Sequence, residues 1–359
     1  MLVAPSAVIN VFNASVTSII RSLDFRRSIG NAVAGAVMGT LAPRDLQRIM
    51  PSGVEAYTTW MARFSESSGR DSYIASTVEI LGDGIAKLYW IGEKDAQSRV
   101  ILFLHGGGYC LPLSKGYFDW AYEMFKSGES SGCKISVAVL DYTLCPEEKY
   151  PTQMYQGVLA LEHILKLGYQ PHNIMLGGDS AGGNLCLSLF SHLMHSYDDQ
   201  RFPKLRLTGP LCGAFVISPL VSLDLSTKSF KENAYSDILS LPNIRDWGAL
   251  MFDETPFSKE SQEGLAWGMA LDGSDEWWRA LNTTVKRLYI SAGGQELFRD
   301  HVVEFSERIR RLGVVDLKSY IDEKDSHDAI YVNFQQGKAI DATRLRLMDW
   351  IIASFMNRE

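Results

Sequence analysis

Short apolar runs alternate with helical segments from about Thr77 to the end of the chain. The run VILFL at 100–104 is continuously apolar and is closed by glycines, which is typical of an interior strand of a mostly parallel sheet. Strands that alternate with helices in this way predict an α/β fold with helices on both sides of the sheet. The predicted strands are 77–81, 85–91, 100–106, 134–142, 173–180, 213–220, 286–294 and 315–322, and the predicted helices are 153–167, 181–195, 302–312 and 343–355.

One segment interrupts this alternation. Residues 222–282 show no convincing strand, and an insertion of this size between two strands is usually a lid or a substrate-facing subdomain. We therefore expect a cap insertion at 222–282 within a catalytic domain formed by residues 70–221 and 283–359. We expect most of its aromatic residues, taken individually, to be ordinary packing residues. The insertion as a whole is expected to shape the pocket. The aromatic residues are Phe230, Tyr235, Trp247, Phe252, Trp267, Trp277 and Trp278.

The N-terminus contains two apolar stretches, which the charged segment RSLDFRR separates. Neither stretch reaches the roughly 20 residues needed to span a bilayer, and the features of a secretory signal are missing. We expect N-terminal cap helices at residues 1–60 in a cytoplasmic protein. Peripheral contact with a membrane surface is the second interpretation. The predicted amphipathic helix carries its apolar residues at near-helical spacing: Val8, Phe12, Val16, Ile19 and Ile20.

The net charge and the cysteines of the chain limit the classes of partner, metal and cofactor that we expect it to bind. A net charge of −7 and the lack of a basic run make nucleic acid an unlikely partner. The five cysteines show neither CxxC spacing nor pairing with clustered histidines, so we expect reduced, mostly buried thiols and neither a metal nor a cofactor.

The most specific motif is Gly178-Asp179-Ser180-Ala181-Gly182, between a predicted strand and a predicted helix. In that context G-x-S-x-G indicates a nucleophile elbow, in which the serine occupies a strained turn between small residues. The alternative for Ser180 alone is a helix N-cap.

A glycine box, His105-Gly106-Gly107-Gly108, follows the strand at 100–104. Successive glycines let backbone N–H groups converge on a developing oxyanion, so the amides of Gly107, Gly108 and Ala181 are the predicted oxyanion hole. The box lacks the spacing of a phosphate-binding loop. His105 precedes the glycines and is interpreted as a residue that orients the loop.

A nucleophilic serine needs a base, and the base needs an acid. Of the two histidines after the insertion, His327 lies in the polar loop EKDSHDAI and is the predicted base, whereas His301 opens a helix. The loop GGQELFRDH offers two acids. Glu296 is preferred because it lies nearer the strand end. Asp300 can instead serve as a first-turn carboxylate of the helix.

Together HGGG, DYTLCPEEKYPTQ, GDSAGGNL, SPLVSL, GGQELFRD and the late SHD resemble the hormone-sensitive-lipase-like family of α/β-hydrolases, most closely its fungal-type carboxylesterases. The resemblance covers about residues 99–330. It implies that GDSAG holds the nucleophile and that N-terminal and mid-chain helices form a cap. This chain departs from the family at the acid loop, where E-L-F-R-D replaces D-P-L-x-D and places Glu296 at the acid position. Tyr109, Cys110 and Asp179 are expected in the substrate pocket.

The expected function is hydrolysis of a fairly bulky apolar ester through an acyl-enzyme on Ser180. The same triad supports acyl transfer, lactone opening or C–C bond cleavage in a natural-product tailoring enzyme, because a fold does not fix its chemistry. A non-catalytic receptor of the same fold is a third interpretation, which the complete Ser, Glu and His set disfavours.

Overall fold

A computed structural model describes residues 3–67, 77–252, 257–338 and 341–357 of the chain. Its centre is an eight-stranded sheet with the order β1-β2-β4-β3-β5-β6-β7-β8, in which β2 runs antiparallel to both of its neighbours, β1 and β4, and all other neighbouring strands are parallel. The strands are β1 (Val78–Ile80), β2 (Lys87–Ile91), β3 (Arg99–Leu104), β4 (Ile135–Asp141), β5 (Ile174–Asp179), β6 (Gly213–Ile217), β7 (Arg287–Gly293) and β8 (Asp316–Asp322).

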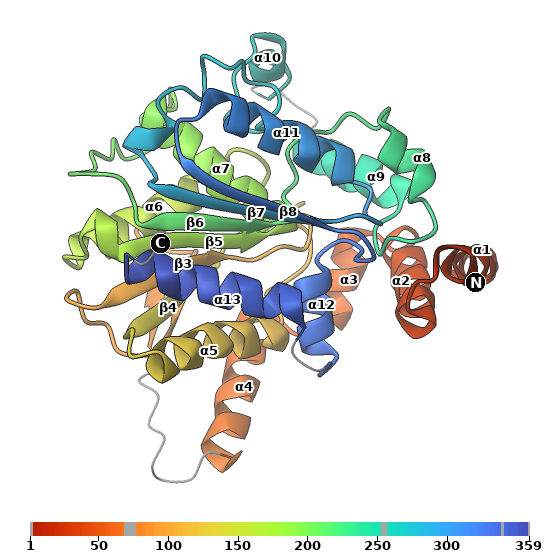
Figure 1. Ribbon diagram of the computed structural model, residues 1–359. Coiled ribbons are helices and arrows are strands. Elements are labelled where there is room, and N and C mark those ends of the chain that lie inside the picture. The colour runs from red at the N-terminus through yellow and green to blue at the C-terminus, as the bar shows by residue number, and fades with distance from the viewer. Residues whose placement is uncertain (1–2, 68–76, 253–256, 339–340, 358–359) are drawn as a thin grey trace.

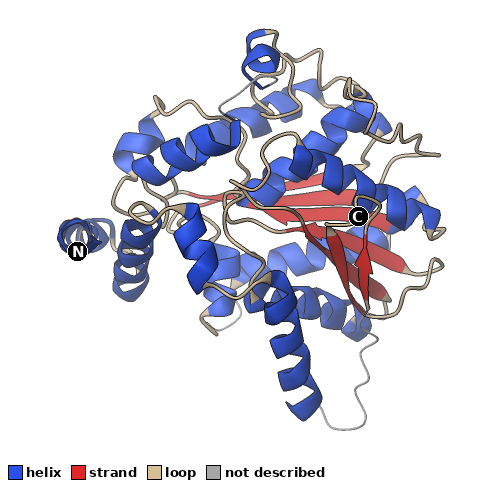
Figure 2. Cartoon of the chain, turned by 180° about the vertical axis from the view of Figure 1, so that it is seen from behind, coloured by secondary structure: helices blue, strands red, loops and turns tan. Residues whose placement is uncertain are grey.

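Helices cover both faces of the sheet, with α6, α7 and α11 on one side and α4, α5 and α13 on the other (Figure 1). The α-helices are α1 (Val3–Arg21), α2 (Phe25–Met38), α3 (Pro43–Ile49), α4 (Gly53–Ser67), α5 (Lys115–Ser130), α6 (Thr152–Lys166), α7 (Ser180–Met194), α8 (Lys228–Glu232), α9 (Leu241–Phe252), α10 (Phe257–Gln262), α11 (Arg299–Leu312), α12 (Ala329–Gln335) and α13 (Ala342–Phe355). Two short 3-10 helices, η1 (Pro171–Asn173) and η2 (Leu281–Thr283), complete the set. Seen from behind, the strands form one twisted layer between the helices (Figure 2).

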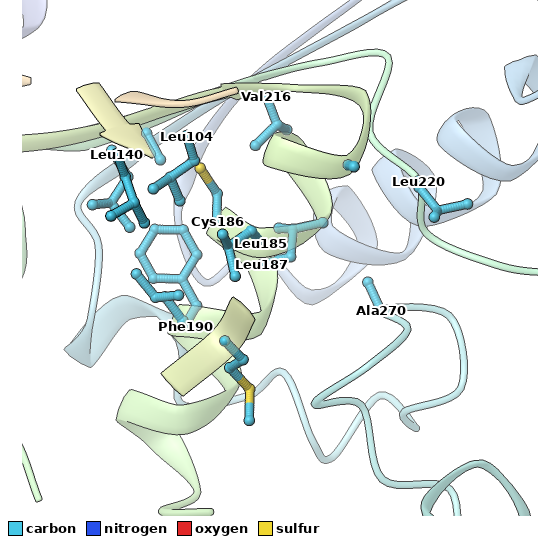
Figure 3. Close-up of a cluster of buried hydrophobic side chains, with 14 of the residues drawn as sticks. Leu104, Leu140, Leu185, Cys186, Leu187, Phe190, Val216, Leu220 and Ala270 are labelled. Carbon is cyan, nitrogen blue, oxygen red and sulfur yellow. The ribbon is translucent and has the colours of Figure 1, made fainter. Parts of the chain in front are cut away.

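The core consists of two apolar layers because side chains alternate across a strand. In β3, Leu102 and Leu104 belong to the layer beneath α6 and α7, whereas Ile101 and Phe103 belong to the layer beneath α4 and α5. Figure 3 shows how α7 enters the first layer, where Cys186 lies close to Leu104. Burial on both faces explains why these strands are continuous apolar runs.

The predicted α/β-hydrolase architecture is confirmed. All eight predicted strands and the four predicted core helices are present, with bounds that differ by a few residues. The described parts of the insertion, 222–252 and 257–282, form α8, α9, α10 and η2 without a strand. Two helices next to the site, α5 and α12, were not predicted from the sequence.

The N-terminal helices differ from one another in what they contact. Helix α1 packs on α2, but the apolar face predicted for it points to solvent, with Phe12 68% and Ile19 73% exposed. The expectation that this apolar face packs over the site is therefore not met by the residues named here. Helix α2 instead meets the insertion, since a Cβ on Gly35 would lie 2.8 Å from the carbonyl oxygen of Ile238. In the described ranges no helix is both long and apolar enough to cross a membrane.

Candidate active site

Ser180 lies at the junction between β5 and α7, at the carboxyl end of the parallel strands. Its φ of +49° is strained for a side chain other than glycine. The turn also needs glycines, because a Cβ on Gly178 would lie 2.5 Å from backbone atoms of Gly182. This is the geometry expected of a nucleophile elbow, in which the hydroxyl projects beyond the sheet.

His327 approaches the serine from the loop after β8. Its Nε2 lies 2.8 Å from the Oγ of Ser180, a hydrogen-bonding distance between a candidate base and a candidate nucleophile. The ring is buried and packs edge-on against Phe298 at 5.3 Å. The backbone N–H of His327 donates to Oδ1 of Asp237 at 2.9 Å, so its loop is anchored from the insertion.

Glu296, in the loop after β7, faces the other ring nitrogen of His327. Its Oε2 lies 3.8 Å from Nδ1 of His327 and accepts hydrogen bonds from Ser218 Oγ at 2.6 Å and from the Gly293 amide at 2.9 Å. Asp300 is turned away, accepting from the Ser229 amide at 2.9 Å in the first turn of α11. The structure thus brings Glu296, and not Asp300, to the histidine.

Two further carboxylates border His327 and were not predicted from the sequence. Asp328 Oδ2 lies 3.2 Å from Nε2 of His327. Asp237 is buried in the insertion and accepts from the amides of both His327 and Leu297, the latter at 2.7 Å. Asp328 follows His327 directly in the sequence, so inspection of SHD could have found it. Asp237 has no local motif and becomes visible only when the insertion is folded over the loops.

Burial and charge act against each other on these groups. Burial alone would lower the pKa of His327. The nearby carboxylates of Asp328, Glu296 and Asp237 have the larger effect and raise that pKa above its ordinary value. Burial raises the pKa of Glu296, and His327 limits the rise. Buried groups whose pKa values are raised in this way are typical of reactive sites.

The glycine box lies across from Ser180. Gly107 and Gly108 have φ values of +98° and +60°, which glycine adopts without strain. In the described part of the chain their amide N–H groups donate to no protein acceptor. N–H groups that form an oxyanion hole must be unoccupied in this way. The ring of Trp247 in α9 packs closely on Gly108: a Cβ added to Gly108 would lie only 2.6 Å from that ring.

His105 and Asp179 hold the box in place. His105 Nδ1 lies 2.8 Å from the Gly106 carbonyl oxygen, and its ring stacks on Tyr142 at 4.2 Å. Burial lowers the pKa of His105 to about 4, so the ring is neutral at pH 7. Asp179 accepts from the Gly106 amide at 3.0 Å and from the Tyr117 hydroxyl at 2.7 Å.

A cavity of about 310 Å³ opens above Ser180, and its lining is mostly apolar. Met38 and Met50 from the N-terminal segment, Tyr109 after the box, and α9 all contribute to it. The other two predicted pocket residues do not line it. Cys110 turns into the core, where its N–H donates to the Gly107 carbonyl at 3.0 Å, and Asp179 is occupied by the box. All five cysteines are buried, and none of them forms a disulfide with another cysteine of the described residues: Cys110, Cys133, Cys145, Cys186 and Cys212.

The N-terminal helices make polar contacts with both of the loops that carry Glu296 and His327. Arg21 donates to Gln295 Oε1 at 2.7 Å, next to Glu296. Arg27 pairs with Asp325 at 2.7 Å, two residues before His327. No cluster of metal-ligating side chains occurs among the described residues.

Known proteins share this fold and parts of this sequence. The sequence model of a family described as having the alpha/beta hydrolase fold matches residues 101–329. Human arylacetamide deacetylase-like 2 is 28% identical over 206 residues, which are 55% of this chain and 47% of that protein. Carboxylesterase NlhH of Mycobacterium tuberculosis is 30% identical over 163 residues, 44% of this chain and 46% of that protein. The chain thus spans about half the length of the curated relatives it matches.

Solved structures agree over more of the chain. The Francisella virulence factor BioJ superposes with a TM-score of 0.65 at 20% identity, covering 89% of this chain and 94% of that chain. Carboxyl esterase 2 of the mycorrhizal fungus Tuber melanosporum gives a TM-score of 0.62 at 23% identity, covering 81% of this chain and 88% of that chain. An esterase of the bacterial hormone-sensitive lipase family gives a TM-score of 0.59 at 22% identity, covering 90% of this chain and 98% of that chain. At such identities the likeness concerns the fold.

Proposed function

Because this chain belongs to the family of hydrolases with the alpha/beta hydrolase fold, we propose that it hydrolyses carboxylic esters through an acyl-enzyme on Ser180. The observation that carries the proposal is the 2.8 Å contact between Ser180 Oγ and His327 Nε2 at the floor of an apolar cavity. Its relatives include a carboxylesterase, which favours ester hydrolysis, and an arylacetamide deacetylase, whose name implies a related acyl hydrolysis.

In the proposed reaction His327 accepts the Ser180 proton at Nε2 while Oγ attacks the ester carbonyl. Negative charge then develops on the carbonyl oxygen, where the amides of Gly107, Gly108 and Ala181 would stabilise it. His327 returns the proton to the departing alcohol, and a water molecule activated by the same ring releases the acid.

Glu296 is the proposed acid of the triad. Its carboxylate would stabilise the imidazolium that forms in each half-reaction, acting from the Nδ1 side of the ring. The separation of 3.8 Å between Oε2 of Glu296 and Nδ1 of His327 supports this role, because Nδ1 of His327 and Oε1 of Glu296 are both buried without a hydrogen-bond partner.

The cavity supports a fairly bulky apolar substrate. At about 310 Å³ it lies at the lower end of the range of ligand pockets, and its walls come from both the N-terminal segment and α9. An apolar acyl or alcohol group would gain free energy by leaving water there.

The exposed face of α1 supports peripheral contact with a membrane surface. Val8, Ile9, Phe12, Ile19 and Ile20 are each at least 60% exposed on one helix. An apolar stripe of this kind inserts at the boundary between headgroups and acyl chains.

Replacing Ser180 with Ala tests the central proposal. Turnover of p-nitrophenyl butyrate should fall on the order of 10⁴-fold, because no nucleophile remains. The fold should persist, since the elbow accepts a small side chain. Ser188→Ala changes another buried serine of α7 and should keep the parent rate. A Ser180→Ala variant that turns over the ester at the parent rate would contradict the proposal, as would a serine-directed phosphonate that labels any other residue.

A further inference from the structure

Asn243 is a buried polar residue of the cavity that the proposed reaction does not use. Among the described residues that line the cavity, three side chains hold a buried polar atom without a hydrogen-bond partner. Two of these, His327 and Asp328, belong to the loop of the proposed base. The third is Asn243 of α9, whose Nδ2 has no partner and whose residue is only 2% exposed.

Several other polar side chains that line the cavity have hydrogen-bond partners within the protein. The Tyr109 hydroxyl donates to Asn184 at 2.5 Å, the Tyr117 hydroxyl donates to Asp179 at 2.7 Å, and Ser114 Oγ lies 3.1 Å from the Tyr331 hydroxyl. A buried amide that lacks a partner destabilises the fold, and such groups are rare in native proteins. A ligand that supplies the missing partner would account for an unsatisfied Asn243 in the wall of the cavity.

Helix geometry places Asn243 near the reacting groups. Asn243, Trp247 and Met251 are four residues apart, so they share one face of α9, and all three line the cavity. Trp247 packs against Gly108 of the proposed oxyanion hole. One helical turn separates Asn243 from Trp247, a distance of about 6 Å along the axis. A group bound at Asn243 would thus lie several bonds from the ester carbonyl.

We propose that Asn243 binds a second oxygen atom of the substrate, by donating its amide N–H to a carbonyl, hydroxyl or ether oxygen. The substrate class is then an apolar ester that carries one additional oxygen function some distance from the scissile bond. This inference rests on the proposed ester hydrolysis at Ser180. It deepens that proposal because a purely hydrocarbon chain would leave the amide of Asn243 buried and unpaired.

The test compares p-nitrophenyl octanoate with a series of p-nitrophenyl oxo-octanoates, in which the keto group is moved along the chain. For the parent protein, kcat/KM should be about tenfold or more higher for at least one oxo-ester than for the plain ester, because a site built around a hydrogen bond rejects the analogue that lacks it. Asn243→Leu, which is apolar and a good helix former, should abolish that preference while still turning over the plain ester.

Matched variants separate hydrogen bonding from shape. Ile244→Leu also alters the cavity wall from α9 and should leave the ratio between oxo-ester and plain ester unchanged. Asn243→Ala guards against misfolding of the leucine variant and should likewise lose the preference. A parent protein with no preference at any keto position would overturn the inference, and so would a preference that survives in Asn243→Leu.

The design also separates failure of this inference from failure of the proposed function. If the parent hydrolyses none of the esters, hydrolysis at Ser180 is wrong. Thermal shifts with the same compounds then still test Asn243. A larger stabilisation by an oxo-ester that disappears in Asn243→Leu supports the inference, and equal shifts for plain and oxo-esters refute it.

Discussion

His327 lies among three carboxylates that come from different parts of the chain. Glu296 faces Nδ1, Asp328 lies 3.2 Å from Nε2, and Asp237 binds the backbone amide. All three carboxylates stabilise the positive charge of the imidazolium, but only one placed at Nδ1 can accept a hydrogen bond from the ring while Nε2 exchanges a proton with Ser180. Position around the ring therefore separates the proposed triad acid from the two carboxylates that act by charge or by anchoring.

Replacing Glu296 with Gln should lower kcat by on the order of 10²-fold or more, since a neutral amide cannot stabilise the imidazolium. Asp300→Asn should leave kcat within about twofold, because Asp300 binds the Ser229 amide and Arg299 away from the histidine. Steady-state kinetics on p-nitrophenyl butyrate measures both. Equal rates for the parent and Glu296→Gln would move the acid to another carboxylate.

Asp328→Asn should shift the pH dependence of kcat/KM. The base works only when neutral, so kcat/KM rises with pH through the pKa of His327. Asp328 contributes to the elevation of that pKa, so its removal should move the acid limb to lower pH by about one unit. Asparagine tolerates the left-handed φ of +53° at this position. Asp316→Asn, on the exposed end of β8, is the control, and an acid limb that stays in place would refute the assigned coupling.

The sequence predicts the residues that carry local patterns. Ser180, the glycine box and His327 stand in motifs or in one loop at a strand end, and the structure brings them together. Asp237 and Asn243 belong to the insertion, where no local pattern marks them. Their proposed roles depend on tertiary contacts, so they become visible only in the folded chain.

At the scale of elements, periodicity predicts the parallel strands because burial on both faces leaves long apolar runs. Helix α5 escaped prediction although Phe118, Ala121 and Met124 recur at helical spacing on its buried side. Glycines and serines at its end, KSGESSG, favour a loop locally, and packing on β4 overrides that preference. The spacing of apolar residues in α1 correctly predicts a helix. That spacing does not predict whether the apolar face packs on the protein or faces solvent.

Charging the exposed face of α1 should weaken membrane contact without altering catalysis. Phe12→Glu combined with Ile19→Glu changes two side chains that contribute little to the protein interior, with 68% and 73% exposure. Binding to phosphatidylcholine vesicles, measured by co-sedimentation, should fall about tenfold or more, while turnover of a short soluble ester stays within about twofold. The double variant Val78→Glu and Ile85→Glu is the control for charge. Weak or absent vesicle binding by the parent itself would refute the proposed contact.

At the scale of the whole molecule, the N-terminal segment and the insertion meet around the site. Met38 and Met50 line the cavity together with residues of α9, and Asn31 donates to Ser326 Oγ at 2.9 Å, beside His327. Arg21 links the end of α1 to Asn233 of the insertion at 2.9 Å and to Gln295 of the acid loop. The residues before the sheet therefore contribute both to the wall of the cavity and to the placement of the two loops.

A chain that begins at Pro51 should consequently lose activity on bulky apolar esters. The truncation removes Met38 and Met50 from the cavity wall, and it leaves Asp325 without Arg27 and the acid loop without Arg21. Exposed apolar surface of the insertion should also lower the melting temperature or promote aggregation, because contiguous apolar patches favour association.

Arg27→Ala in the full chain separates the two effects of that truncation. It keeps the cavity wall but removes the partner of Asp325, so kcat on a short ester should fall by a few-fold while KM for a bulky ester changes little. The measurements are kcat and KM on p-nitrophenyl butyrate and on a long-chain p-nitrophenyl ester. Full activity and solubility of the truncated chain would show that the N-terminal segment is dispensable and that the insertion alone covers Ser180. Loss of activity on both esters in the truncated chain, with a milder loss in Arg27→Ala, would instead show that the N-terminal helices build the site together with the insertion.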